Sequence, residues 1–251
     1  MGLDIPSTLI LEDILQSGMT KALDLGATDF AAVGSREFAR MIRFTDNSVT
    51  LSTSEDTSNM HFYIGYKKRR LIGSIDLVDR QKLLEEIENI IKHSENIEPS
   101  KEYVKLPSGL VDYTIPIEKK QLGNDEIDDI VDTVEGVINT GLKHGAKRVA
   151  GTLKTSLSKM FLITSGKRSG KHITSNTELN IRAFNKDGSG HGVALSTNLK
   201  DLEWEKSAKK AGEMAKRSRR GELVKAGKYD CLLSRVVMGD LISSAGSGLS
   251  A

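Results

Sequence analysis

A glycine- and lysine-rich segment carries residue types that can bind phosphate. It runs Gly166-Lys167-Arg168-Ser169-Gly170-Lys171-His172. A phosphate-binding loop needs four residues between its glycines and a serine or threonine after the lysine, so that backbone amides surround the phosphate and a hydroxyl binds magnesium. Here three residues separate the glycines, and a histidine follows the lysine. We therefore interpret the segment as a hairpin turn flanked by solvated charges.

The histidines do not form a metal-binding pattern. They are His61, His93, His144, His172 and His191, and none is followed by a glutamate. A helical zinc site needs two histidines on one face together with a carboxylate that acts as general base. His172 and His191 could approach each other across a sheet, but a surface or sheet-packing role is the favoured interpretation for both. The sequence predicts no metal ligand and no catalytic residue in this chain.

The single cysteine, Cys231, excludes an intrachain disulfide and is typical of a protein in a reducing compartment. Leu232 and Leu233 follow it in a segment that resembles a strand, which predicts a buried thiol. Lys228, three residues earlier, would then point to the opposite face of the strand. It is a poor candidate for stabilising a thiolate.

Two basic runs could contact a polyanion: Lys67-Lys68-Arg69-Arg70, and the cluster at residues 216–220. Nucleic-acid binding usually combines such charges with aromatic side chains on which bases stack. Aromatic residues make up only 5% of the chain, and the net charge is +2. We interpret both runs as solvated ends of elements and expect no nucleic-acid partner.

The composition is typical of a globular protein, with 38% hydrophobic and 28% charged residues. The sequence has no run of eighteen apolar residues that could form a membrane-spanning helix. The segment Met1-Gly2-Leu3-Asp4 lacks the basic flank of a secretory signal. These features predict a cytoplasmic protein that does not bind a membrane.

Part of the sequence occurs twice, and this determines which elements we expect. Gly26-Ala27 and Gly145-Ala146 are separated by 145 − 26 = 119 residues, and the same offset superposes Met41 on Met160 and Thr45 on Thr164. Thr57-Ser58-Asn59 returns as Thr174-Ser175-Asn176 at an offset of 174 − 57 = 117. A duplicated unit of this size predicts two similar lobes that share or pair their sheets.

Each copy has the pattern of a helix, short strands and a second helix. In the first copy a helix over 11–25 ends at Gly26, and Asp76 caps a later helix whose apolar stripe begins at Leu77. Turns are expected at Gly34-Ser35, Asp46-Asn47 and Lys67-Lys68. The strands between them are expected at residues 30–33, 40–45, 49–52, 60–66 and 71–75.

In the second copy a helix that starts near residue 127 ends at Gly145, and Asn198 caps a helix that runs to about Arg217. Strands are expected at residues 148–153, 159–164, 172–174, 178–185 and 192–196. Pro99, Pro107 and Pro116 predict an irregular crossover between the copies. A short strand at residues 227–234 and a helix over 236–249 are expected to follow.

The expected fold class is α+β, with two similar lobes, each a mostly antiparallel strand meander flanked by helices. The expected domains are a first lobe at 1–96, a crossover linker at 97–123, a pseudo-repeat lobe at 124–225, and the start of a C-terminal domain at 226–251. The last segment ends among apolar and small residues, so we expect a truncated chain whose C-terminal domain is otherwise missing.

Several segments, taken in order, resemble the PmbA/TldD family. They are Leu25-Gly26-Ala27 before a strand, the turn Asp46-Asn47, the helix after Asp76, the segment 185–190 (Asn-Lys-Asp-Gly-Ser-Gly) and the segment 228–234 (Lys-Tyr-Asp-Cys-Leu-Leu-Ser). The resemblance covers nearly the whole chain. It implies that the chain corresponds to the N-terminal portion of family members, which continue into a further β-rich domain.

The resemblance also implies a metallopeptidase made of two subunit types. The catalytic type carries a helical His-Glu pair, three further residues and a second histidine, whereas the other type lacks these ligands and pairs with the first to form a closed chamber. Ser243-Ser244 stand here at the His-Glu positions, and Gly248 falls near the second histidine. Serine hydroxyls replace neither an imidazole ligand nor a carboxylate base. The chain therefore resembles the metal-free PmbA (TldE) type.

Two hypotheses follow from the sequence. In the first, the chain is the non-catalytic subunit of a cytoplasmic peptidase, pairs with a TldD-like subunit that holds zinc or a similar divalent metal, and holds short or unfolded peptides at a sheet edge. In the alternative, it is a truncated stand-alone module that binds peptide or protein without a hydrolytic role. Some family members carry the historical name modulator of DNA gyrase. The sequence identifies no peptide-binding residue.

Overall fold

The computed structural model describes residues 8–76, 79–113 and 127–249. The N-terminal residues before Thr8, together with Leu77 and Pro116, lie outside the described part. Contacts group the chain into two compact units, residues 1–220 and residues 221–251, and each unit is described by itself.

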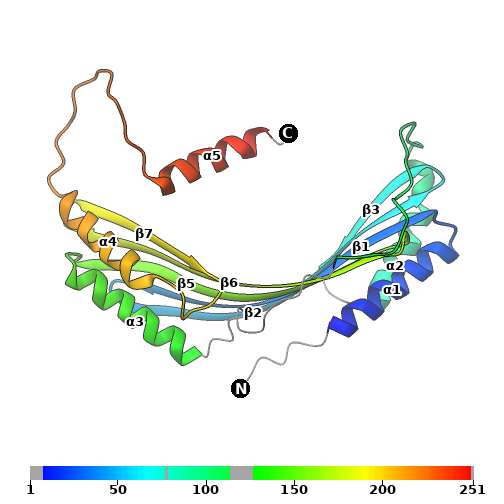
Figure 1. The fold of residues 1–251 in the computed structure, drawn as a ribbon, viewed down its shortest axis with the longest axis horizontal. Helices are drawn as coiled ribbons and strands as arrows, with labels where there is room; N and C mark the ends of the chain where they lie inside the picture. Colours follow the sequence, from blue (N-terminus) through cyan, green and yellow to red (C-terminus); the bar gives the residue numbers. More distant parts are fainter. Residues whose placement is uncertain (1–7, 77–78, 114–126, 250–251) are drawn as a thin grey trace. The chain divides into compact units, whose positions relative to one another are not determined.

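The first unit repeats one order of elements, a helix, three strands and a helix (Figure 1). The first half contains α1 (Thr8–Asp24), β1 (Asp29–Thr45), β2 (Ser48–Tyr66), β3 (Arg69–Ile75) and α2 (Arg80–Lys92). The second half contains α3 (Ile127–Lys143), β5 (Arg148–Thr164), β6 (Arg168–Asn185), β7 (Gly188–Ser196) and α4 (Trp204–Arg217). A short 3₁₀ turn, η1 (Ser94–Asn96), and β4 (Val111–Asp112) lie between the halves in sequence. The α+β class with two similar halves is thus confirmed.

The strands are longer and fewer than the sequence predicts. Residues 30–33 and 40–45 belong to one strand, β1, and the expected turn at Gly34-Ser35 is wrong, since Gly34 pairs with Met60 of β2 and with Phe161 of β5. In the same way, the short strands expected within β2, β5 and β6 merge. Polar residues that resemble a loop stay extended here because neighbouring strands pair with them, a tertiary effect that overrides local preference.

The strands form one sheet in the order β3-β2-β1-β5-β6, with β7 and β4 both beside β6. All pairs are antiparallel except β4 with β6. In the central pair, Phe38 of β1 lies opposite Leu157 of β5, and 38 + 119 = 157. The duplicated halves are therefore related by a pseudo-twofold axis through the Phe38–Leu157 pair, because that pair joins equivalent positions of the two copies.

The two halves exchange the ends of their central strands. Phe30 at the start of β1 lies in a core with α1 and α2, whereas Ile42 and Phe44 at its end lie in the other core, with α3 and α4. Conversely, Phe161 and Ile163 at the end of β5 lie in the core of the first half. Each core is thus built from both halves of the sequence. In Figure 1, α1 and α2 lie at one end of the long strands, and α3 and α4 at the other.

Several local predictions are confirmed, and two helix caps are not. Gly26 and Gly145 end their helices at φ of 91° and 116°, a region that favours glycine. Asp79, rather than Asp76, caps α2 by accepting a hydrogen bond from the Lys82 amide at 2.9 Å. Asn198 accepts from the Asp201 amide at 2.9 Å in a turn that precedes α4, so α4 begins later, at Trp204. Both errors arise because several Asp, Asn, Ser or Thr residues near the start of a helix can cap it, and the sequence does not show which of them does.

The second unit contains one helix, α5 (Arg235–Leu249), which agrees with the helix expected over 236–249. Residues 227–234 form no strand, and Cys231 is exposed, so the predicted buried position is wrong. Without strand partners the apolar pair Leu232-Leu233 does not bury the thiol. Among the described helices, none is both long enough and apolar enough to cross a bilayer.

Candidate functional site

One face of the sheet is free of helices within the described part of residues 1–220. Successive side chains of a strand point to opposite faces. On β1 the side chains that enter the two cores have even numbers, as at Phe30 and Phe44, and on β5 they have odd numbers, as at Val149 and Phe161. All four helices therefore cover the same face. We call the opposite face the helix-free face.

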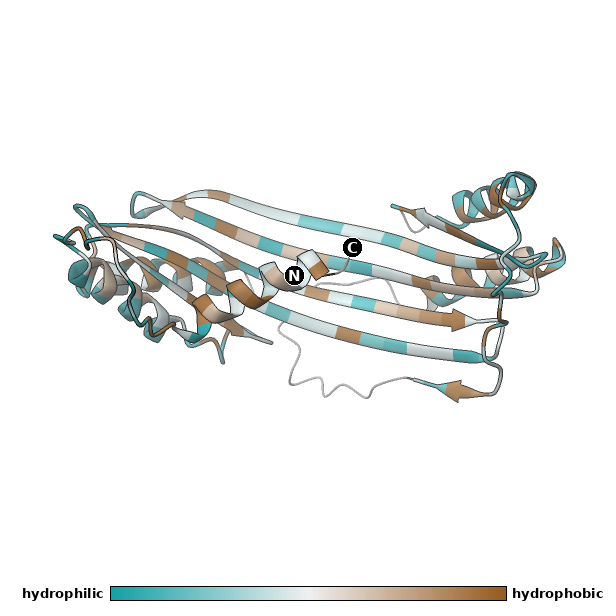
Figure 2. Ribbon diagram, turned by 90° about the horizontal axis from the view of Figure 1, so that it is seen from above, coloured by the Kyte–Doolittle hydropathy of each residue, from teal (hydrophilic) through white to brown (hydrophobic). Residues whose placement is uncertain are grey.

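The middle of the helix-free face is polar. Ser35 of β1 donates a hydrogen bond to the Asn59 side chain of β2 at 2.7 Å, and Lys154 of β5 lies 3.4 Å from the Glu37 carboxylate. Figure 2 shows teal and pale segments along the central stretches of the long strands. Hydroxyls, amides and paired charges can bind another polar chain without strong selection among its side chains.

On the other face of the sheet middle, Arg36 and Asp56 form a two-pronged ion pair. Nε of Arg36 donates to Oδ1 of Asp56 at 2.7 Å, and Nη2 donates to Oδ2 at 2.5 Å. This hydrogen bonding lowers the pKa of Asp56 and raises that of Arg36, although desolvation partly opposes both shifts. The side chains are 31% and 45% exposed. The pair therefore fixes the positions of the two side chains and contributes only about 0.5 kcal/mol to stability.

Two strand edges beside this middle have no partner strand among the described residues. β3 pairs with residues 60–66 of β2 only, so no described strand pairs with the outer edge of residues 48–57. On the other side of the sheet, β7 pairs with β6 from Thr177 onward and β4 pairs with Arg168 and Ser169, so residues 170–174 have no partner strand on that edge among the described residues. A free edge presents backbone N–H and C=O groups that can pair with an extended peptide. Side chains such as Glu55 and Asp56 reduce its tendency to aggregate.

The three positions singled out by the family resemblance lie on α5. Ser243, Ser244 and Gly248 are all exposed there. Two hydroxyls and a glycine supply none of the imidazole, carboxylate or thiolate groups that bind zinc in proteins. These residues do not fit a catalytic zinc ion. In the described residues, no group of three or more His, Cys, Asp or Glu side chains could hold a metal.

The histidine pair considered from the sequence is not brought together. His172 and Arg182, the partner of His191, both lie on β6, 182 − 172 = 10 residues apart. At about 3.4 Å per residue this separation is about 34 Å. His191 instead contacts the Asn180 side chain at 2.9 Å.

The basic run at residues 67–70 forms more contacts than a solvated turn would. Lys67 and Lys68 occupy the β2–β3 turn and are exposed. Arg69, however, donates through Nε to the Ile97 carbonyl at 2.6 Å, and Arg70 donates through Nη2 to the Glu102 carbonyl at 2.7 Å. The two arginines therefore hold the segment that follows α2 against the sheet.

A buried carboxylate, Asp29, completes this attachment. It is 4% exposed, accepts a hydrogen bond from the Tyr103 hydroxyl and accepts another from the Leu106 amide at 3.1 Å. Burial, and secondly the hydrogen bond to Asp29, raise the pKa of Tyr103 to about 12. No sequence motif indicated this contact, because Asp29 and Tyr103 are distant in the chain.

The Tyr103 contact predicts a specific pH dependence. The raised pKa of Tyr103 means that folding favours the neutral phenol, so its contribution is complete below about pH 10 and declines as the pH rises toward about 12. We expect Tyr103→Phe to lower the free energy of unfolding by about 1–2 kcal/mol at pH 7 and to flatten this alkaline decline. Tyr113→Phe is the control, because the Tyr113 hydroxyl also forms a hydrogen bond, accepting from Nη1 of Arg168 at 3.1 Å, but at an exposed position. Urea titrations from pH 7 to 11 that gave equal slopes for wild type and Tyr103→Phe would contradict the assignment.

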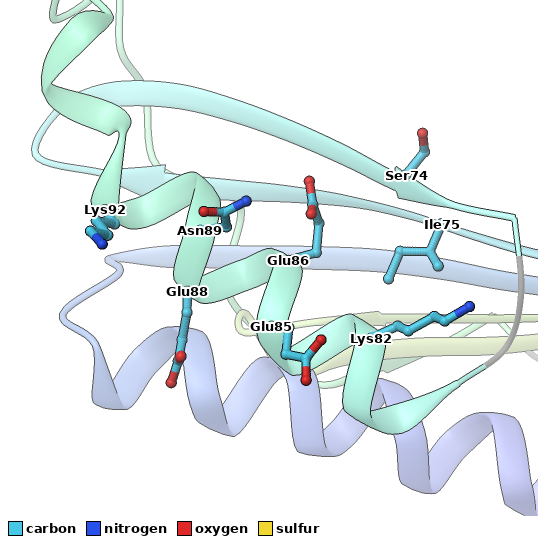
Figure 3. Close-up of a pocket in the computed structure, with 8 residues that line it drawn as sticks. All are labelled: Ser74, Ile75, Lys82, Glu85, Glu86, Glu88, Asn89 and Lys92. Carbon is cyan, nitrogen blue, oxygen red and sulfur yellow. The ribbon is translucent and has the colours of Figure 1, made fainter.

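A surface pocket of about 550 Å³ lies between β3 and α2 (Figure 3). Its lining includes Lys82, Glu85, Glu86 and Lys92, so both signs of charge are present. Glu88, also in the lining, forms an ion pair with Lys21 of α1. The mixed charges indicate a solvated helix surface rather than a site for one class of ligand.

The chain was compared with family models, curated proteins and solved structures. No family model and no curated protein matches it. A proposed modulator of DNA gyrase from Bacteroides thetaiotaomicron superposes with a TM-score of 0.67 at 15% identity, over 87% of this chain and 52% of that protein. A proposed modulator of a DNA gyrase from Thermotoga maritima gives 0.63 at 14% identity, over 82% and 47%.

TldE from Thermococcus kodakarensis also gives a TM-score of 0.63, at 15% identity, over 82% of this chain and 47% of that protein. The chain thus spans about half the length of the solved proteins that it matches. At such low identity the likeness is one of fold. The fold that this chain shares with structures of the PmbA/TldD family is the sheet built from two similar halves of the sequence, together with its four helices.

Proposed function

We propose that this chain is the metal-free, non-catalytic subunit of a cytoplasmic metallopeptidase of the TldD/PmbA type. The observation that carries the proposal is a fold shared with TldE, combined with two serines and a glycine at the positions where the resemblance would place metal ligands. The zinc, or a similar divalent metal, would belong to a TldD-like partner subunit. No hydrolytic step is therefore assigned to residues of this chain.

In this proposal the chain contributes a surface that holds short or unfolded peptides. The outer edge of β2 at residues 48–57, which has no partner strand among the described residues, supports this role, because backbone pairing accepts an extended peptide with little regard to its sequence. The adjoining hydroxyl and amide side chains, such as Ser35 and Asn59, add hydrogen bonds. Most extended segments of a folded protein are already paired within its own sheets, so this edge favours short or unfolded peptides.

The test is to purify the protein alone and together with a TldD-like subunit from the same organism. We expect the lone protein to contain less than stoichiometric zinc and to leave an unstructured peptide intact, and the mixture to form a complex that cleaves it. Stoichiometric zinc and cleavage by the lone protein would refute the non-catalytic assignment. A protein that binds the peptide but ignores the partner subunit would instead support the stand-alone binding module.

A further inference from the structure

A second cavity, of about 750 Å³, lies where α3 and α4 both end. Its wall comes from the last residues of α3, the loop between α3 and β5, the end of β6 at Asn185, the last turn of α4, and Arg219 just beyond it. We call it the basic cavity. All of its lining residues belong to the unit of residues 1–220.

The lining carries a large excess of positive charge. Five cationic side chains contribute to it: Lys143, Lys147, Lys216, Arg217 and Arg219. Glu213 is the one carboxylate in the lining, and it lies 3.9 Å from Nδ1 of His144 and 4.0 Å from Nζ of Lys209. Within the described residues none of the five cations forms an ion pair. Like charges gathered around one cavity repel one another, and a bound anion relieves this repulsion.

One of these cations has a buried donor that lacks an acceptor. Nε of Arg219 is inaccessible to solvent and forms no hydrogen bond within the described part of the chain. A buried donor without an acceptor is unfavourable. A ligand could reach this Nε only if the Arg219 side chain moved, so the case for binding rests on the charge of the lining.

The duplication supplies an internal control. At the offset of 119, Lys143 and Lys147 correspond to Asp24 and Thr28. Both copies place these positions at and just after the end of a helix, where the helix dipole favours cations. The first copy nevertheless has an acid at Asp24, and its Thr28 hydroxyl contacts the Tyr103 hydroxyl at 2.9 Å. The fold therefore does not require the lysines of the second copy.

We propose that the basic cavity binds a small anion with two or more phosphate groups. Lysine ammonium groups bind phosphate oxygens as point charges, and arginine adds a planar fork of donors. The lining has no Phe, Tyr or Trp on which a base could stack, so recognition is limited to the phosphates. A concave site of this size suits a small molecule better than an extended nucleic acid. Inorganic tripolyphosphate and a nucleoside triphosphate share this chemistry.

Calorimetric titration of the full-length protein with tripolyphosphate, and separately with ATP, both without magnesium, tests the proposal. We expect tripolyphosphate and ATP to bind with affinities within about threefold of each other, because the cavity recognises only their phosphate groups. The double variant Lys143→Glu, Lys147→Glu should weaken tripolyphosphate binding by at least about tenfold, since it removes two charge-assisted contacts.

The matched control is Lys200→Glu, Lys210→Glu, which changes the net charge equally at two exposed lysines outside the cavity. It should weaken binding by less than about twofold at 0.15 M salt, where distant charges are screened. Circular dichroism tests whether both double variants are folded. If Lys143→Glu, Lys147→Glu is not folded, the single variant Lys147→Gln takes its place. Equal weakening by the two double variants, no detectable binding of tripolyphosphate, or ATP binding more than tenfold tighter would each overturn the proposal.

Discussion

Replacing Ala39 with proline is expected to cause the largest loss of stability of any single change outside the cores. Ala39 is 5% exposed and lies in the middle of β1, opposite Glu55 of β2 and Ser156 of β5. Proline removes a ladder hydrogen bond, and its ring clashes in a strand that is paired on both sides. We expect the free energy of unfolding to fall by about 3 kcal/mol or more. Urea titration followed by far-UV circular dichroism measures the loss.

The control for this change is Val224→Pro, in an exposed and irregular segment. It should alter stability by less than about 0.5 kcal/mol. If Ala39→Pro were tolerated equally well, residues 34–39 would form a loop, as the sequence alone suggests, and the continuous strand would be wrong.

Phe44→Ala is expected to destabilise the core of the second half, although Phe44 belongs to the first copy. Its side chain is fully buried in that core, opposite Gly151, where an added Cβ would lie 2.6 Å from Cζ of the ring. Removing a buried phenylalanine costs about 3–5 kcal/mol, because the cavity closes only partly. Trp204, the only tryptophan, packs against the same core, so its fluorescence reports the change.

Phe38→Ala is the matched control, since Phe38 is the same residue type on the same strand but is only half-buried in the sheet middle. It should lower stability by about 1 kcal/mol. Two results would show that β1 does not reach the second core. One is an equal loss of unfolding free energy in the two variants, and the other is an unfolding transition, followed by Trp204 fluorescence, that Phe44→Ala leaves unchanged.

Much of the fold follows from local patterns. Glycine is needed where a helix ends at positive φ, so Gly26 and Gly145 identify two helix ends, and the offset of 119 identifies the duplication. The lengths of the strands could not be predicted in the same way. Gly34-Ser35 has the composition of a turn, and only pairing with strands distant in sequence keeps it extended.

The sites were less predictable, because they depend on contacts between distant segments. The basic run at 216–220 was recognised, but its assembly with Lys143 and Lys147 depends on the packing of α4 beside α3. A signal was present in the sequence: the duplicated copies differ in charge at these positions, where Asp24 and Thr28 stand in the first copy. Asp29 and Tyr103 offered no such signal, since neither belongs to a motif.

The helix-free face depends on the register of β1 against β5, because that register places all four helices on the opposite face of the sheet. A disulfide between Phe38→Cys and Leu157→Cys, in a Cys231→Ser background, tests that register directly. The two residues are opposite each other in the antiparallel pair, where Cα atoms lie about 4.5–5.5 Å apart, within the range of a disulfide. We expect mild oxidation to form the intramolecular bond in the folded protein, and not in the control Phe38→Cys, Lys154→Cys, whose cysteines would lie on opposite faces. A control that forms the bond as readily, or a test pair that forms it only between molecules, would contradict the pseudo-twofold sheet.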